Sequence, residues 1–256
     1  MDYFGVDYFG HVVRVLIPHK GDETLAIATQ LPGIEFLDVW DLGVTDTGLA
    51  NLKSLTSLTS LKIDSFDITD TGLASLKYLT SLKTLEISAE GITDAGLVYV
   101  AGLPKLREFI LNSGSIGDAG LSILKSRDQI EVLVLWNTKV TDDGLANLEG
   151  LFRLKHFLFY GPQITDAGLA HLRGLTQMRI LDLPCIQVTD AGLAHLEGLT
   201  RLETLLLNNT QVTETGLLTH LKGLTRLKEL GLSKGTVTAA GEREFQTAIP
   251  NLVITY

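Results

Sequence analysis

Aspartate recurs in this sequence at intervals of 24 residues, so metal binding is the first chemistry to consider. The series comprises Asp46, Asp70, Asp94, Asp118, Asp142, Asp166 and Asp190, and Glu214 continues it. Repeated aspartates bind calcium in some β-solenoids, but those sites also need a glycine-rich nonapeptide, which this sequence lacks. Each aspartate stands singly at the start of an expected helix. We therefore expect it, or the threonine before it, to cap that helix.

Three histidines offer a second possible metal site. His171, His195 and His220 occupy equivalent or nearly equivalent helix positions in successive repeats. Zinc needs its ligands about 2 Å away, whereas neighbouring helices pack about 8–10 Å apart. These side chains would not converge on one ion. We expect them on helix surfaces and predict no metal site.

Nucleophilic catalysis has one candidate set, formed by Cys185, His156 and Asp182. Cys185 is the only cysteine, which also excludes an intramolecular disulfide and any zinc site of several cysteines. In the strand alignment below, Cys185 lies five residues beyond His156, or about 16 Å along a strand. Hydrogen-bond reach is about 3 Å, and the sequence contains no P-loop, dinucleotide-binding or HExxH motif. We predict that the protein is not an enzyme and needs no cofactor.

The composition limits the classes of partner that the protein can bind. The 256 residues are 45% hydrophobic and carry a net charge of −9. They can bury a large core, but they repel the phosphate backbone of nucleic acids, which we exclude as partners. No apolar run reaches the length of a membrane span. The N-terminus lacks the features of a signal peptide, which together with the single cysteine favours a cytoplasmic location.

The repeat itself predicts the elements that position these residues. Its first half, LTSLTSLKI at 55–63, ends in the alternation Leu61-x-Ile63, which is typical of a strand with one buried face. Its second half, ITDTGLASLKYL at 68–79, spaces leucines three apart, as on a short helix. One strand and one helix per repeat build parallel strands backed by helices. Because helices are wider than strands, we expect a horseshoe with the strands on its concave face.

We expect a single domain over residues 1–256. Residues 1–43 are interpreted as an N-terminal cap with a degenerate repeat, 44–236 as eight full repeats, and 237–256 as a C-terminal cap. Counting back 24 residues from Leu37 and Val39 reaches Val13 and Val15, which predicts an additional strand in the same register.

The pattern LxxLxxLxLxxTxVT, as in Leu196 to Thr213, resembles the leucine-rich repeat. The helix half, TDxGLxxL, is similar to the ribonuclease-inhibitor-like and F-box-associated subclass and to its bacterial relatives. The resemblance covers roughly residues 12–256. It implies an α/β leucine-rich-repeat solenoid with a concave parallel sheet and convex short helices. Members share a scaffold but differ in partners, so the resemblance also allows a substrate receptor of a ubiquitin-ligase-type adaptor or a host-directed effector.

Equivalent strand positions form columns across the concave face. The middle column begins with charges of alternating sign at Arg14, Asp38, Lys62 and Glu86 and turns apolar at Ile110. With its neighbouring columns it predicts an exposed patch that pairs apolar and aromatic anchors with polar orienting residues. The anchors are Val132, Val134, Trp136, Leu158, Tyr160, Ile180 and Pro184, and the orienting residues are His156 and Asp182.

An exposed patch of this kind is typical of an interaction site, with tryptophan and tyrosine as its anchors. We therefore expect a protein or peptide as partner. An acidic flank, formed by Asp38, Asp64, Glu86 and Glu108, favours a basic one. Self-association through the patch, and simple packing of a crowded sheet, are the alternatives. We expect a monomer or a weak homo-oligomer.

Overall fold

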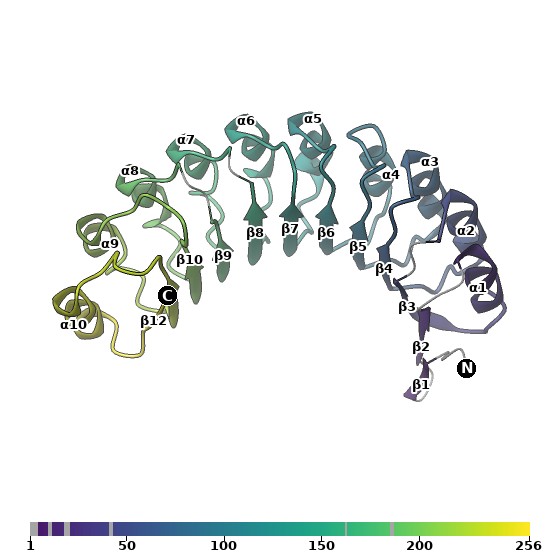
Figure 1. The fold of residues 1–256 in the computed structure, drawn as a ribbon, viewed down its shortest axis with the longest axis horizontal. Helices are drawn as coiled ribbons and strands as arrows, with labels where there is room; N and C mark the ends of the chain where they lie inside the picture. The colour runs from purple at the N-terminus through teal and green to yellow at the C-terminus, as the bar shows by residue number, and fades with distance from the viewer. Residues whose placement is uncertain (1–4, 10–11, 18–20, 41–42, 162, 185–186) are drawn as a thin grey trace. The chain divides into compact units, whose positions relative to one another are not determined.

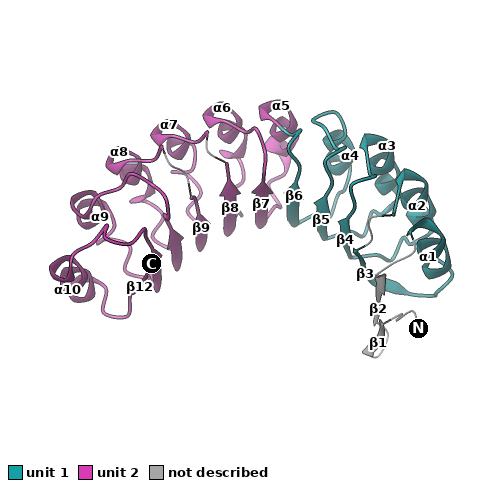
Figure 2. Ribbon diagram, viewed as in Figure 1, with its two compact units in different colours: residues 1–116 teal, residues 117–256 magenta. Residues whose placement is uncertain are grey.

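The computed structural model describes residues 5–9, 12–17, 21–40, 43–161, 163–184 and 187–256. The chain divides into two compact units, Met1–Ile116 and Gly117–Tyr256 (Figure 2), which are described separately. In each unit the strands line one side and the helices line the other (Figure 1). The expectation of one domain over the whole chain stays a prediction.

The described residues of unit 1 form six strands, joined edge to edge in sequence order. They are β1 (Gly5–Phe9), β2 (Val12–Ile17), β3 (Ile34–Trp40), β4 (Ser60–Asp64), β5 (Thr84–Ser88) and β6 (Glu108–Asn112). The helices are α1 (Gly21–Ala28), α2 (Asp46–Ala50), α3 (Asp70–Leu73) and α4 (Leu97–Ala101), with 3-10 turns η1 (Asn51–Ser54) and η2 (Ala74–Tyr78). β1 runs antiparallel to β2, and the other pairs are parallel. The antiparallel β1 was not foreseen from the sequence.

Unit 2 repeats the same plan, with six parallel strands in the part of it that the structure describes. They are β7 (Val132–Trp136), β8 (His156–Tyr160), β9 (Ile180–Asp182), β10 (Thr204–Leu206), β11 (Glu229–Gly231) and β12 (Val253–Thr255). The helices are α5 (Asp118–Leu121), α6 (Asp142–Leu145), α7 (Asp166–Ala170), α8 (Asp190–Leu193), α9 (Glu214–His220) and α10 (Ala239–Ala248), with 3-10 turns η3 (Ser122–Ser126), η4 (Ala146–Leu148) and η5 (Ala194–Leu196).

The leucines of each repeat form its core. In one repeat, Leu193, Leu196, Leu199, Leu202 and Leu205 are all fully buried. Burying one such side chain contributes about 1.5–3 kcal/mol. The regular positions of the repeat thus supply the apolar energy of the fold, and the residues between them are left to form its surface.

The predicted columns are correct from β3 onward within each unit. Asp38 pairs with Lys62 and Lys62 with Glu86, and in unit 2 Val134 pairs with Leu158. The prediction was wrong for β2, where Arg14 lies opposite Phe36 and Leu16 lies opposite Asp38. An irregularity between Val13 and Arg14 shifts the register, and Val15 rather than Val13 pairs with Leu37.

The recurring aspartates link each repeat to the next. Asp166 Oδ1 accepts the backbone N–H of Thr189 at 2.8 Å, and its Oδ2 accepts the Thr189 hydroxyl at 2.6 Å. We call this pair of bonds the Asp–Thr bracket. It recurs at Asp22, Asp46, Asp70, Asp118, Asp142 and Asp190. Each bracket joins residues 23 positions apart, so it contributes to stacking rather than to one helix.

The capping prediction is therefore half right. Thr189 does cap its own helix, because its hydroxyl accepts the N–H of Ala191 at 3.3 Å. Asp190 instead bonds to Thr213 of the following repeat. The regular recurrence of the TD pair thus has two separate causes. The threonine caps the helix within its repeat, and the aspartate bonds to the next repeat.

The bracket also explains the glycine of the TDxGL motif. A Cβ atom on Gly192 would lie 2.4 Å from Asp166 Oδ1, and one on Gly168 would lie 2.3 Å from Asp142 Oδ1. Both distances are below any ordinary contact, so only glycine lets the helix approach the preceding carboxylate.

Glu214 shows how the bracket tolerates the inserted residue of the last full repeat. Its partner, Thr238, lies 24 rather than 23 positions away, and the Thr238 N–H donates to Glu214 Oε2. Glutamate is one methylene longer than aspartate. The longer side chain accompanies the longer spacing.

Candidate functional site

The open face of unit 2, meaning the sheet face away from the helices, carries the predicted patch on β7, β8 and β9. The register places Val132, His156 and Ile180 in one row and Val134, Leu158 and Asp182 in the next. Trp136 pairs with Tyr160 at the ends of β7 and β8. The structure thus brings together the residues that the sequence assigned to the patch, with Pro184 two positions after Asp182.

The patch is less exposed than the sequence suggested. Trp136 and Tyr160 are 37% and 41% exposed, whereas Val134 retains only 5% of its surface. Val132, Leu158, Ile180 and Pro184 are half-buried, as is His156. The expectation that Val134 would be an exposed anchor was wrong, because its neighbours in the sheet cover it.

Trp136 and Tyr160 form an edge-to-face aromatic pair. Their ring centroids lie 6.2 Å apart with an interplanar angle of 76°. Such pairs contribute about 0.5–1.5 kcal/mol beyond burial. The Tyr160 hydroxyl also donates a hydrogen bond to Asp182 Oδ2. Trp136 on one side and Asp182 on the other therefore fix the orientation of Tyr160.

Asp182 is a buried carboxylate, with 6% of its surface exposed. Burial raises its pKa, and the hydrogen bond from Tyr160 acts in the opposite direction. Burial also raises the pKa of Tyr160 to about 12, assisted by the hydrogen bond to Asp182 and by the charge of that carboxylate. A tyrosine with such a pKa stays protonated at neutral pH and remains a hydrogen-bond donor. The hydrogen bond between the two residues therefore persists at neutral pH and fixes the Tyr160 hydroxyl.

The predicted acidic flank lies on unit 1 and is partly neutralised. Lys62 Nζ lies 2.8 Å from Glu86 Oε2, as the alternating column predicted. Asp38 is 5% exposed and accepts the indole N–H of Trp40 at 2.8 Å. The expectation that Asp38 would be an exposed charge was wrong. Asp64 and Glu108 are exposed, and Glu108 also accepts a hydrogen bond from Thr84 at 3.2 Å.

The sequence analysis missed a second aromatic position on the same columns. Trp40 is 68% exposed and Phe36 is 37% exposed, both on β3 of unit 1. Trp40 occupies the column position of Trp136, four repeats earlier. Extending the column toward the N-terminus would have identified it.

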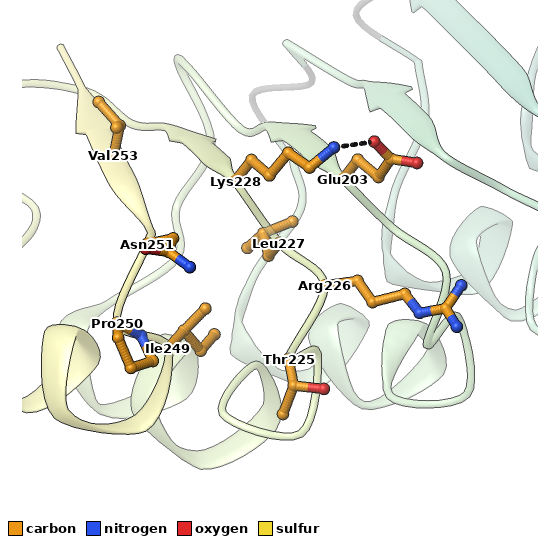
Figure 3. Close-up of a pocket in the computed structure, with 9 residues that line it drawn as sticks. All are labelled: Glu203, Thr225, Arg226, Leu227, Lys228, Ile249, Pro250, Asn251 and Val253. Carbon is orange, nitrogen blue, oxygen red and sulfur yellow. Dashed lines mark hydrogen bonds and ion pairs between the residues drawn. The ribbon is translucent and has the colours of Figure 1, made fainter.

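A cavity of about 550 Å³ in unit 2 was also missed (Figure 3). It lies where the chain passes from helix to strand, away from the patch residues. Its lining comes from Glu203, the turn 225–228, the turn 249–251 and Val253. These turns lead into β11 and β12 of two successive repeats, and their spacing in the sequence does not show that a cavity lies between them.

The remaining chemical candidates do not form a reactive site among the described residues. His171 Nδ1 lies 2.7 Å from Glu149 Oε1, and His220 Nδ1 lies 2.6 Å from Glu197 Oε1, each pair joining neighbouring repeats. Across the described ranges, no group of three or more His, Cys, Asp or Glu side chains could hold a metal ion. Cys185 lies outside the described residues. Within them, no helix has the length and apolar character needed to cross a membrane.

Of the known proteins compared with this chain, only solved structures match it. No family model and no curated protein matches the chain. Among solved structures, the chain is similar to an internalin from Listeria monocytogenes, with 19% sequence identity and a TM-score of 0.46. The match covers 96% of this chain and 86% of the internalin chain.

Proposed function

The chain is a leucine-rich-repeat protein with an α/β solenoid fold, and from that premise we propose that it is a non-enzymatic scaffold that binds a protein or peptide. Folds of this class commonly mediate protein–protein interaction. The proposed binding surface is the open face of unit 2, with Trp136 and Tyr160 as anchors.

The oriented aromatic pair carries the proposal. Trp136 and Tyr160 expose large apolar surface at adjacent strand ends, and their contact holds both rings in place. Side chains that are already ordered lose little conformational entropy when a partner binds. Tryptophan and tyrosine are also the residues most enriched among binding hot spots. Both properties favour recognition over simple packing.

The residues around the Trp136–Tyr160 pair suggest how this surface would recognise a partner. Leu158 and Ile180 extend the apolar surface, so the partner should present an apolar side chain to this part of β8 and β9. Asp182 acts through Tyr160 by fixing its hydroxyl. On unit 1, the exposed carboxylates of Asp64 and Glu108 favour a basic segment. Val134 and Asp38 are buried and take no direct part.

The test begins with affinity capture from the native source and identification of the captured protein by mass spectrometry. Binding of that purified partner is then measured by calorimetry. Trp136→Ala and Tyr160→Ala should each weaken binding by about 2 kcal/mol or more if they are hot spots. Tyr160→Phe separates the ring from the hydroxyl. Phe152→Ala is the control, since it removes an exposed aromatic ring of unit 2 that lies outside β7–β9.

An unchanged affinity for the double variant Trp136→Ala/Tyr160→Ala would refute the proposed surface. Circular dichroism must first show that the variant is folded. Sedimentation velocity of the wild type and of the same variant distinguishes self-association. Wild-type dimers that the double variant abolishes would mean that the pair binds a second copy of the chain.

A further inference from the structure

The cavity of unit 2 lies between two successive turns that lead into strands. The first turn, 225–228, enters β11, and the second, 249–251, enters β12 (Figure 3). Its volume of about 550 Å³ lies within the usual range for ligand pockets. None of its lining residues belongs to the proposed binding surface on β7–β9, so it calls for a separate explanation.

The base of the cavity is apolar. Leu227 and Ile249 line it and are themselves 1% and 2% exposed, so they form a fixed floor. Pro250 and Val253 line its sides and are exposed, with Val253 at 59%. Figure 3 places Ile249 and Pro250 together at one end and directs the Asn251 amide toward the interior. An apolar group could therefore be buried here beside a neutral donor.

One side of the cavity carries excess positive charge. Glu203 Oε2 lies 2.5 Å from Lys228 Nζ, and Glu203 Oε1 lies 3.5 Å from Arg179 Nη1. The hydrogen bond from Lys228 is the main cause that lowers the pKa of Glu203, and the charges of Lys228, Arg179 and Arg226 add to it. Two cations thus pair with one carboxylate and the charge of Arg226 adds to theirs, in a protein whose net charge is −9.

The excess of positive charge on this side of the cavity can accommodate a second anion besides Glu203. The Lys228 ammonium has three donors, and the structure assigns one of them to Glu203. The Lys228 side chain is 70% exposed, which leaves room for a ligand to approach. The Thr225 hydroxyl and the Asn251 amide add neutral donors to the lining. A bare phosphate would use the cations but not the apolar floor.

We propose that this cavity binds an acidic peptide segment, with separate carboxylates at Lys228 and at Arg226 and a neighbouring apolar side chain over Ile249, Pro250 and Val253. Charge complementarity identifies the partner, because the cations attract carboxylates. The apolar floor selects aspartate or glutamate next to leucine or a similar residue. This second site acts independently of the aromatic pair.

The proposal is tested by fluorescence polarisation with the full chain and labelled model peptides. The probe alternates aspartate and leucine over six residues. One comparison peptide replaces its aspartates with asparagine, and another replaces its leucines with serine. Arg226→Ala/Lys228→Ala removes the cations, and Val253→Asp alters the apolar wall. Lys234→Ala is the matched control. It removes an exposed positive charge from the same unit, and Lys234 does not line the cavity.

We expect the aspartate–leucine peptide to bind saturably, and its affinity to fall about tenfold in Arg226→Ala/Lys228→Ala. Both comparison peptides should bind at least about tenfold more weakly, and salt near 0.5 M should weaken binding because the charges are exposed. Lys234→Ala and Trp136→Ala should leave the affinity unchanged. The last result also separates this site from the proposed surface on β7–β9.

Four outcomes would overturn the proposal. They are no binding of the probe up to about 1 mM, equal binding of the asparagine peptide, an equal loss in Lys234→Ala, and full competition by inorganic phosphate at the affinity of the peptide. The last outcome would identify a simple anion site. Circular dichroism of each variant establishes that a loss of binding is not a loss of fold.

Discussion

The Asp–Thr bracket predicts that one substitution changes sign when its neighbour is altered. In the wild type, Gly192→Ala places a Cβ atom 2.4 Å from Asp166 Oδ1. That oxygen cannot move freely, because it accepts the Thr189 N–H at 2.8 Å. In an Asp166→Ala background the obstructing carboxylate is gone, and the remaining close atom, Leu169 Cδ1 at 3.0 Å, is the end of a flexible side chain that can move aside. The same substitution should then stabilise the protein, since alanine favours a helix more than glycine does.

The magnitudes follow from the contacts. Overpacking at Gly192 costs about 1–3 kcal/mol and is offset by about 1 kcal/mol of helix propensity, which leaves a net loss of up to about 2 kcal/mol. Asp166→Ala alone removes two hydrogen bonds to a charged, partly exposed group and should cost about 2–4 kcal/mol. In the Asp166→Ala background, Gly192→Ala should gain about 0.5–1 kcal/mol. The coupling energy is therefore about 0.5–3 kcal/mol.

Urea unfolding measures this cycle. Trp136 lies in the same unit, and a Trp40→Phe background makes it the only tryptophan. Its fluorescence and the far-ultraviolet circular dichroism are followed together. Gly174→Ala is the control, because its added Cβ would meet nothing within 4 Å and should behave alike in both backgrounds. Equal effects of Gly192→Ala with and without Asp166 would refute the explanation of the TDxGL motif.

Three further predictions concern single sites. Because the pKa of Tyr160 is raised to about 12, the folded state holds this proton more tightly than the unfolded state does. The contribution of Tyr160 to the free energy of unfolding should then be fully present below pH 10 and fall as the pH rises toward 12. Tyr160→Phe should flatten this pH dependence in urea titrations. It should also remove one late-ionising tyrosine from the ultraviolet titration. Gly117→Thr should stabilise unit 2 by about 0.5–1 kcal/mol, because α5 begins at an extended glycine without a side-chain cap; an unchanged melting temperature would contradict this. Lys62→Ala should cost less than about 1 kcal/mol, since the Lys62–Glu86 pair is partly exposed; a larger loss in thermal unfolding would mean that the pair is structurally essential.

The sequence predicted the repeat, its strands and most of the columns, because a fixed period ties each side chain to the same position in every turn. Leu61 and Ile63 are buried as the alternation required. The method failed at β2, where the spacing between Val15 and Leu37 is 22 rather than 24 residues. A periodic count cannot detect such a shift in β2, because successive apolar residues there fit the strand pattern in more than one register.

The candidate site was harder to predict, since exposure depends on neighbours that a column does not contain. Val134 and Leu158 occupy adjacent positions of one column, yet Val134 is buried and Leu158 is half-buried. The Tyr160–Asp182 hydrogen bond joins two different columns. The Asp–Thr bracket was missed for a similar reason, because helix capping explains the same residues locally and needs no partner 23 positions away.

The bracket also has a consequence for how this gene can change in length. Each repeat that carries the Asp–Thr bracket offers an acceptor to the one after it and a donor to the one before it, so a duplication or deletion of 24 residues between two such repeats restores the same chemistry at the new junction. An insertion or deletion of a single residue would separate the acceptor from its donor unless the length of the acceptor side chain changed as well. Glu214 is such a correction, since a single extra methylene accompanies the one-residue insertion. The number of repeats can thus drift under selection, while the chemistry of each junction stays constant.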